Sequence, residues 1–186
     1  MRALAEELGA TPMAIYKHVR GRDELELLVV TRSFAGLKLP SLELEAVEWL
    51  RRVAVQVREI GLTYPGVMDY LLDHGPVAEP ALRIFDRTVT RLHAAGVGYR
   101  EAGELHNTFF SWLAGSVRRQ HAAQAAEPDA FASFLTAARA LPAAEYPGLQ
   151  RALAHMQKVD FDREFKTSLQ LLLDAIELRI TRSRSR

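Results

Sequence analysis

The sequence contains no cysteine, which excludes disulfide bonds, thiolate nucleophiles and cysteine-based zinc sites. It also contains no apolar run of about 18 residues, the length that a membrane-spanning helix requires. Its first residues, MRALAEE, lack the apolar stretch of a secretion signal. We therefore expect a cytoplasmic protein without a membrane partner.

Motifs of enzymatic chemistry are missing as well. There is no Gly-rich phosphate loop, no His-Glu-x-x-His metal helix and no Ser-His-Asp order, and the six histidines are scattered. The pairs Asp69 with Asp73 and Asp160 with Asp162 are explained more simply as solvated faces or helix starts. An enzyme is therefore disfavoured, and we predict neither a cofactor nor a metal site.

Strand patterns are equally scarce, because no segment alternates apolar and polar residues with β-branched enrichment and hairpin signals. Apolar residues recur instead at spacings of three and four, as in Val47, Leu50, Ala54, Val57 and Ile60. Of the 186 residues, 48% are hydrophobic and 25% charged, which is typical of a globular protein with a packed core. These features predict an all-α fold, and the length suffices for a small module and a larger one.

The first eight residues predict a helix with Leu4, Ala5 and Leu8 facing inward. Gly9 then supplies a left-handed C-terminal stop, because a residue without a side chain adopts that conformation at no steric cost. A helix, a short turn that contains glycine and a second short helix follow one another here. This order is typical of a helix-turn-helix unit.

The second helix of this unit is predicted from Pro12 to His18. Thr11 offers an N-cap hydroxyl, and proline at the first helical position loses no hydrogen bond. Ile15 and Val19 have the spacing to pack on the preceding helix. The net charge of +1 indicates nothing about nucleic acid, but the stretch from Thr11 to Arg22 is basic and free of acidic residues. This charge fits either a solvated helix face or a surface for phosphates.

Residues 4–25, LAEELGATPMAIYKHVRGRDEL, closely resemble the DNA-binding signature of TetR-type repressors. That signature is Leu-Ala-x-x-Leu-Gly, a four-residue stretch, a short helix carrying Leu-Tyr-x-His, and a basic residue before Glu-x-Leu. The turn glycine, the tyrosine and the basic residue after the turn all fall in register here. The resemblance implies a helix-turn-helix DNA-binding domain with a connecting helix over residues 1–36, a helical ligand-binding and dimerisation domain over residues 41–181, and a basic tail over residues 182–186. The family has one further helix before this motif, so the resemblance implies that the first helix of the module is missing from this chain.

The resemblance also implies a DNA-binding role for the short helix, which enters the major groove with its first residues nearest the bases. Met13 and Ala14, which follow Pro12, are expected to contact thymine methyls, and Lys17 to donate to guanine. Phosphate contacts are expected from Thr11, Tyr16, His18 and Arg22. Packing is the alternative role for Tyr16 and for His18. A dimer would present two such helices about 34 Å apart, which implies a pseudo-palindromic operator of double-stranded DNA.

Repressors of this type respond to a small-molecule effector, and ligand pockets combine apolar walls with a few polar groups. The candidates are aromatic or polar residues that interrupt apolar helix faces: Tyr70, His74, Phe85, Thr88, His106, Asn107, Phe110 and Trp112. A core position is the alternative for each of them. Asn107 is the strongest candidate, because an amide among aromatic side chains is costly to bury without a partner. Tyr70 and His74 match the magnesium-binding histidine of tetracycline repressors poorly, so we predict neither tetracycline nor a metal.

The last helix carries an apolar stripe that Leu171, Leu173, Leu178 and Ile180 widen, and so wide a stripe must be covered on more than one side. A second copy of the chain could cover it in a four-helix bundle, and burial inside one chain is the alternative. The predicted homodimer interface consists of Leu113, Val117, Phe165, Leu169, Leu172, Leu173 and Ile176. The sequence thus predicts a ligand-responsive repressor. In it, the helix from Arg22 to about Leu37 joins the DNA-binding helices to the ligand-binding domain. A helical adaptor without small-molecule control is the alternative.

Overall fold

The structure, a computed structural model, describes residues 1–125, 130–156 and 159–185, and it is helical without a strand over these ranges. The helices are α1 (Arg2–Glu7), α2 (Pro12–Tyr16), α3 (Arg22–Ser33), α4 (Ala46–Thr63), α5 (Val67–His74), α6 (Glu79–Ala94), α7 (Tyr99–Ala125), α8 (Ala130–Arg139), α9 (Pro147–Leu153) and α10 (Phe161–Arg184). The predicted all-α fold is confirmed. None of these helices has both the length and the apolar character needed to cross a membrane.

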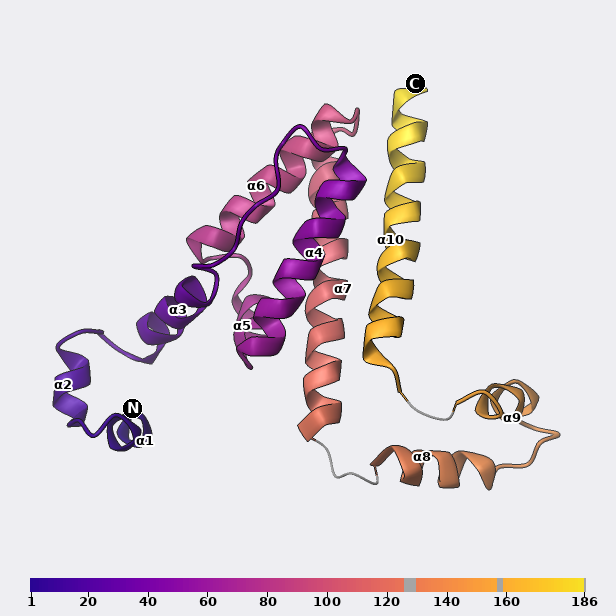
Figure 1. The fold of residues 1–186 in the computed structure, drawn as a ribbon, viewed down its shortest axis with the longest axis horizontal. Helices are drawn as coiled ribbons and strands as arrows, with labels where there is room; N and C mark the ends of the chain where they lie inside the picture. The colour runs from indigo at the N-terminus through magenta and orange to yellow at the C-terminus, as the bar shows by residue number, and fades with distance from the viewer. Residues whose placement is uncertain (126–129, 157–158, 186) are drawn as a thin grey trace.

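The helices form a main body with smaller groups at its two ends (Figure 1). Helices α4, α6, α7 and α10 make up the body, and α5 packs against α7 and α3. At one end α1 and α2 lie apart from the body, and α3 connects them to it. At the other end α8 and α9 pack on each other around Leu135, Ala138 and Leu153.

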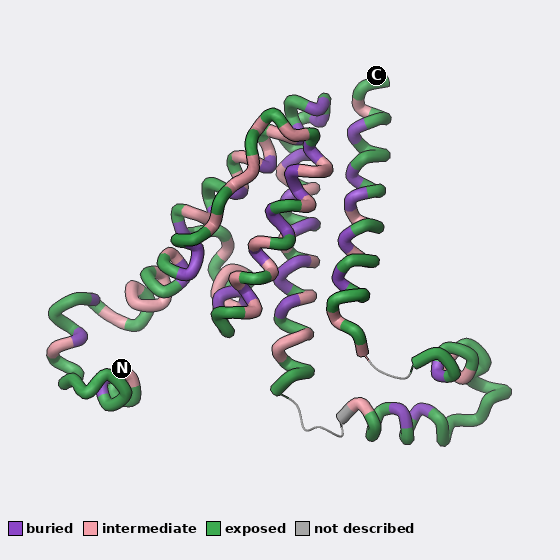
Figure 2. Tube along the Cα trace, viewed as in Figure 1, coloured by how far each residue is buried: buried purple, intermediate pink, exposed green. Residues whose placement is uncertain are grey.

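The main core forms where the apolar faces of α4 and α7 meet. Trp49, Val53 and Val57 lie at helical spacing on α4 and are buried, and Leu113 and Val117 are buried on α7. In Figure 2 the buried residues of these helices line their inner faces, with exposed residues on the outside. Each such side chain contributes roughly 1.5–3 kcal/mol when it is fully buried. Burial of these side chains therefore holds the body together.

Helix α10 covers the body with its own apolar stripe. Most of the predicted dimer-interface residues are buried inside the single chain: Leu113, Val117, Phe165, Leu169, Leu173 and Ile176. They pack the chain's own core, because α10 lies against α4 and α7. Contact of these side chains with a second copy stays a prediction. Leu172 is only partly buried. The exposed apolar side chains of α10 are Leu171, 65% exposed, and Leu178, 50% exposed.

Two helix ends differ from the sequence prediction. The connecting helix α3 ends at Ser33 instead of near Leu37, and Phe34 at its C-cap turns into the main core. The basic tail predicted from residue 182 is helical as far as Arg184, whose Nε donates to the carbonyl of Ala95 at 2.9 Å. Arg186 lies outside the described residues.

At Gly61, α4 lies close against Met68 of α5 and Val117 of α7. A β-carbon at this position would lie 2.9 Å from Cγ1 of Val117 and 3.0 Å from Cγ of Met68. We expect Gly61→Ala to lower the free energy of unfolding by about 1–3 kcal/mol, because the buried, β-branched Val117 has little room to move aside. Urea unfolding measures this change.

Gly103 in α7 provides the matched control, because a β-carbon there meets no atom within 4 Å. Gly103→Ala should raise the free energy of unfolding by roughly 0.5–1 kcal/mol through helix propensity alone. Two variants of equal stability would contradict the packing assigned to Gly61.

Candidate functional site

The turn between α1 and α2 depends on Gly9. Its φ of +59° lies in the left-handed region, where glycine carries no steric penalty. The amide of Gly9 donates to the carbonyl of Glu6 at 3.1 Å, and the amide of Ala10 donates to the carbonyl of Ala5 at 2.9 Å. These two bonds form a Schellman motif, which ends α1 and turns the chain. The stop predicted at Gly9 is confirmed.

Helix α2 begins as the sequence predicts. The hydroxyl of Thr11 accepts from the amide of Ala14 at 3.2 Å, and Pro12 occupies the first helical position. The helix ends at Tyr16, two residues before the predicted end, so Lys17 and His18 lie in the turn that follows it. The short helix and the turn together form the reader, which we define as residues 11–20.

A small core separate from the main core holds the reader. Ala5, Ile15 and Val19 are buried together, and Leu25 of α3 packs against them. The predicted packing of Ile15 and Val19 on the preceding helix is confirmed. Leu8, expected to face inward, is 64% exposed, because α1 ends at Glu7 and Leu8 is its C-cap residue.

The predicted DNA-binding side chains lie at the surface. The exposed ones are Thr11, Pro12, Met13, Tyr16, Lys17, His18 and Arg22, and Ala14 is half-buried. The exposure of Tyr16 and His18 disfavours the packing alternative for both. The short helix therefore presents polar and apolar groups to solvent together, as a surface that reads base edges requires.

Arg22 forms an ion pair with Glu26 on the exposed side of α3. Nε of Arg22 donates to a carboxylate oxygen of Glu26 at 2.6 Å, and this hydrogen bond raises the pKa of Arg22. Ion pairs between exposed side chains contribute little to stability. A phosphate can therefore replace Glu26 as the partner of Arg22.

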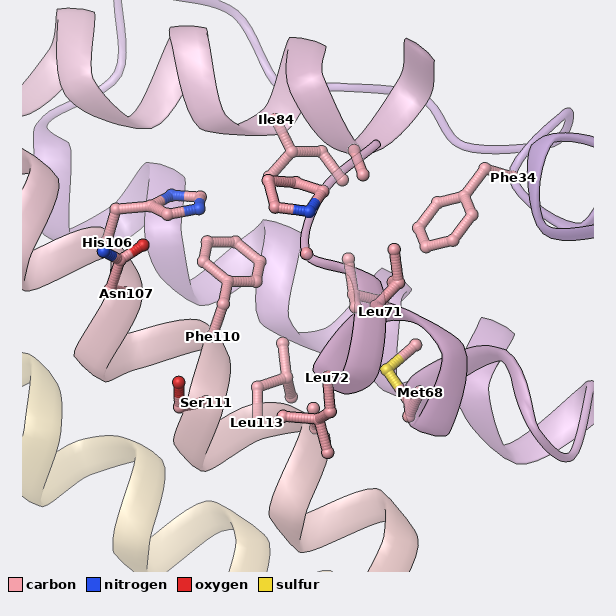
Figure 3. A pocket seen from close by; sticks show the side chains of 15 residues that line it. Phe34, Met68, Leu71, Leu72, Ile84, His106, Asn107, Phe110, Ser111 and Leu113 are labelled. Atoms are coloured by element: carbon pink, nitrogen blue, oxygen red, sulfur yellow. The ribbon is translucent and has the colours of Figure 1, made fainter. Parts of the chain in front are cut away.

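A cavity of about 230 Å³ lies where α5, α6 and α7 meet the end of α3 (Figure 3). Its apolar walls and loop residues are Phe34, Val57, Met68, Leu71, Leu72, Gly75, Pro76, Ala81, Ile84, Phe110, Leu113 and Ala114. Its polar side chains are His106, Asn107 and Ser111 of α7. No charged side chain is found among these lining residues. The cavity is thus mostly apolar with a few polar groups, which is the usual character of a ligand site.

His106 is the buried polar group of this cavity. Its side chain is only 5% exposed, and its ring lies 4.4 Å from the ring of Phe85 and 4.5 Å from that of Phe110. Nδ1 is buried and has no hydrogen-bond partner among the described residues. Burial lowers the pKa of His106 to about 4, so the ring is neutral at pH 7. A neutral ring offers one donor and one acceptor to a ligand.

The structure brings part of the predicted ligand-binding set together. His106, Asn107 and Phe110 line the cavity. Asn107 is exposed, so the expectation of a buried amide is wrong: it follows His106 on the helix and turns toward the solvent side of the cavity. Phe85 contacts the ring of His106 but does not line the cavity.

The remaining predicted ligand residues lie elsewhere. The buried hydroxyl of Thr88 donates to the carbonyl of Ile84 at 2.8 Å within its own helix. Trp112 stacks on Phe165 with ring centroids 5.6 Å apart, in a second, wider hollow of about 880 Å³ between α7 and α10. Tyr70 and His74 stack on each other at 4.3 Å and do not line the cavity.

The sequence interpretation missed the apolar lining residues. Phe34, Met68, Leu71 and Leu72 come from α3 and α5, and they have the same spacing and polarity as ordinary core residues. For the three residues of α5 the distinguishing signal is the pair of glycines that bound the helix, Gly66 and Gly75, both with positive φ. Phe34 has no such signal.

Comparison with known proteins places this architecture in a family. A family model described as "Tetracyclin repressor-like, C-terminal domain" matches residues 40–180, which is more than half of the chain. The chain belongs to the TetR family. The family membership predicted from residues 4–25 is thereby confirmed. No curated protein matches this TetR-family chain.

Solved structures share the fold of this TetR-family protein. The TetR family protein ActR of Streptomyces coelicolor, in complex with actinorhodin, has a TM-score of 0.82 at 22% identity, over 97% of this chain and 87% of that one. BioQ of Mycobacterium smegmatis has a TM-score of 0.66 at 20% identity, over 94% and 84%. A TetR variant of Acinetobacter baumannii AYE, in complex with minocycline, also has a TM-score of 0.66 at 20% identity, over 95% and 83%. At these identities the likeness is one of fold.

The buried His106 makes a prediction about stability and pH. Its pKa in the folded protein is about 4, below the value of about 6.5 expected when unfolded, so the neutral ring stabilises the fold above pH 6.5. This contribution is lost as the pH falls from 6.5 towards 4. Between pH 7 and 4.5 the native protein should lose about 2 kcal/mol of unfolding free energy that His106→Phe retains.

Urea unfolding at the two pH values measures the difference between native protein and variant. His155→Phe is the control, because His155 is exposed after α9 and should leave the pH dependence of the native protein unchanged. Parallel pH curves for the native protein and His106→Phe would contradict the burial of a neutral imidazole.

Proposed function

We propose that this TetR-family protein is a transcriptional repressor that binds a pseudo-palindromic operator as a dimer and is released by a small molecule. The exposed, capped helix α2 is the observation that carries this proposal. It stands away from the main body (Figure 1), with Met13 69% exposed and Lys17 exposed beside it. A helix of this kind is the element that helix-turn-helix proteins insert into the major groove.

In this role Met13 and Ala14 contact thymine methyls and Lys17 donates to guanine acceptors. Thr11, Tyr16, His18 and Arg22 lie at the surface around the helix and contact phosphates, which position the protein without reading sequence. Lys17 follows the last residue of α2 and is exposed, so no protein group covers its long side chain.

Helix α3 connects DNA reading to the cavity. Leu25 packs on the small core of the reader, and Phe34 at the other end of α3 lines the cavity. A ligand that displaces Phe34 therefore changes the position of α3 and, through Leu25, the reader. Allosteric coupling of this kind is typically about 1–3 kcal/mol, which is roughly 5–150-fold in operator affinity. Bound actinorhodin in ActR and bound minocycline in the Acinetobacter TetR variant support a ligand-binding role for the shared fold.

The hollow between α7 and α10 is the surface we assign to the dimer. Trp112 and Leu171 both line it, and most of the surface of Leu171 is exposed in the single chain. The ring of Phe165 beneath Trp112 supports this surface from the core. Two copies that pair through α7 and α10 make a four-helix bundle, which fixes the separation of the two readers.

The role of Lys17 can be tested by operator binding. We expect Lys17→Ala to weaken binding to DNA from upstream of the protein's own gene by about 5–150-fold, because a specific contact to guanine contributes roughly 1–3 kcal/mol. Fluorescence anisotropy with labelled DNA measures this affinity across a series of salt concentrations.

Lys166→Ala is the matched control, since Lys166 is an exposed lysine on α10, far from the reader. It should leave the affinity of the native protein unchanged. With about 6–10 phosphate contacts, native binding should weaken 10³–10⁵-fold between 50 and 200 mM salt. Binding that is flat with salt, or equally affected by the two lysine variants, would favour a helical adaptor over a repressor.

A further inference from the structure

The cavity described above has a polar end and an apolar end. In Figure 3 His106 and Asn107 lie at one end and Phe34 at the other, with Met68 and Leu71 of α5 nearby. His106 is buried, whereas Asn107 and Ser111 are exposed at the edge of the cavity. A molecule in this space therefore meets a single buried polar group, the imidazole.

The absence of charge in the lining restricts what can bind. The described residues around the cavity include no lysine, arginine, aspartate or glutamate. Transfer of an unpaired carboxylate or ammonium group from water into such surroundings is unfavourable by several kcal/mol. The neutral imidazole supplies no compensating charge. A ligand that buries a charged group inside the cavity is therefore disfavoured.

The volume restricts the size of the ligand. At about 230 Å³ the cavity is smaller than the sites of about 300–1,000 Å³ that hold drug-sized molecules. One or two rings fit this space better than an extended ring system. The apolar end, with Phe34 and Met68, favours a hydrocarbon or aromatic surface.

The imidazole of His106 restricts the polar group of the ligand. Nδ1 is fully buried, so the ring nitrogen that a ligand in the cavity can reach is Nε2. Nε2 is either the donor or the acceptor of the neutral ring, depending on the tautomer. A hydroxyl group both donates and accepts, so it bonds to Nε2 in either tautomer.

We propose that the cavity binds a small, uncharged, largely apolar molecule of one or two rings whose hydroxyl group bonds to Nε2 of His106. This inference rests on the proposed function, since it names the class of effector for the same cavity. The hydroxyl lies at the His106 end and the ring extends towards Phe34, so the apolar part of the ligand contacts the end of α3.

Three probes of matched shape test the proposal: 2-naphthol, naphthalene and 2-naphthoate. Their dissociation constants are measured by equilibrium dialysis against the native protein at neutral pH, without DNA. We expect 2-naphthol to bind about tenfold more tightly than naphthalene, the effect of one buried hydrogen bond. We expect 2-naphthoate to bind at least about a hundredfold more weakly than 2-naphthol, because its charge is unpaired in the cavity.

Variants locate the preference for the hydroxyl at His106. In His106→Phe the preference for 2-naphthol over naphthalene should disappear, while naphthalene binding reports that the cavity persists. His155→Phe, the same substitution at an exposed site, should keep the preference. If His106→Phe loses its fold, the ranking of the three probes on the native protein still decides the ligand class.

Several results would overturn the proposal. These are binding of 2-naphthoate as tight as that of 2-naphthol, a hydroxyl preference that survives in folded His106→Phe, and no binding of any probe to the native protein. Because DNA is absent from this assay, a protein that binds 2-naphthol and fails to bind an operator would contradict the proposed function and leave the ligand class standing. The reverse result would contradict the ligand class alone.

Discussion

Burial of Phe34 in the main core attaches the reader to the rest of the molecule. The small core around Ile15 and the main core around Trp49 are separate clusters, and α3 is the helix that contributes to both. Leu25 fixes one end of α3 to the reader, while Phe34 fixes the other end beside the cavity. Because a helix transmits displacement as a rigid element, the position of Phe34 sets the orientation of α2 in our account.

The walls around Phe34 explain why this position can respond to a ligand. Helix α5 packs on both α3 and α7, and it contributes Met68 and Leu72 to the cavity. The opposite side of the body, where α4, α7 and α10 meet, buries Val117 and Leu173, and the hollow on that side lies between α7 and α10. The cavity beside Phe34 is therefore the space that borders the end of α3. A molecule that fills the cavity contacts α5 and the end of α3 as well as α6 and α7.

Local chemistry made the reader predictable from the sequence. The left-handed conformation of Gly9 and the hydroxyl cap of Thr11 depend only on residues within five positions along the chain. The sequence alone therefore reveals them. The cavity could not be predicted in the same way. Met68 has the spacing of a core residue, and only tertiary packing decides whether an apolar helix face meets another helix or an empty space. For the same reason the wide stripe of α10 indicated burial but not its partner, and Leu169 proved to be covered by the chain itself.

Reciprocal binding of ligand and operator is the measurement that tests this account most directly. Operator affinity is measured with and without saturating 2-naphthol, and 2-naphthol affinity with and without operator. The account predicts that ligand and operator each weaken the binding of the other about 5–150-fold, because the two sites share α3. Thermodynamic linkage requires the two factors to be equal. Operator affinity that is unchanged by a ligand shown to occupy the cavity beside Phe34 would contradict it.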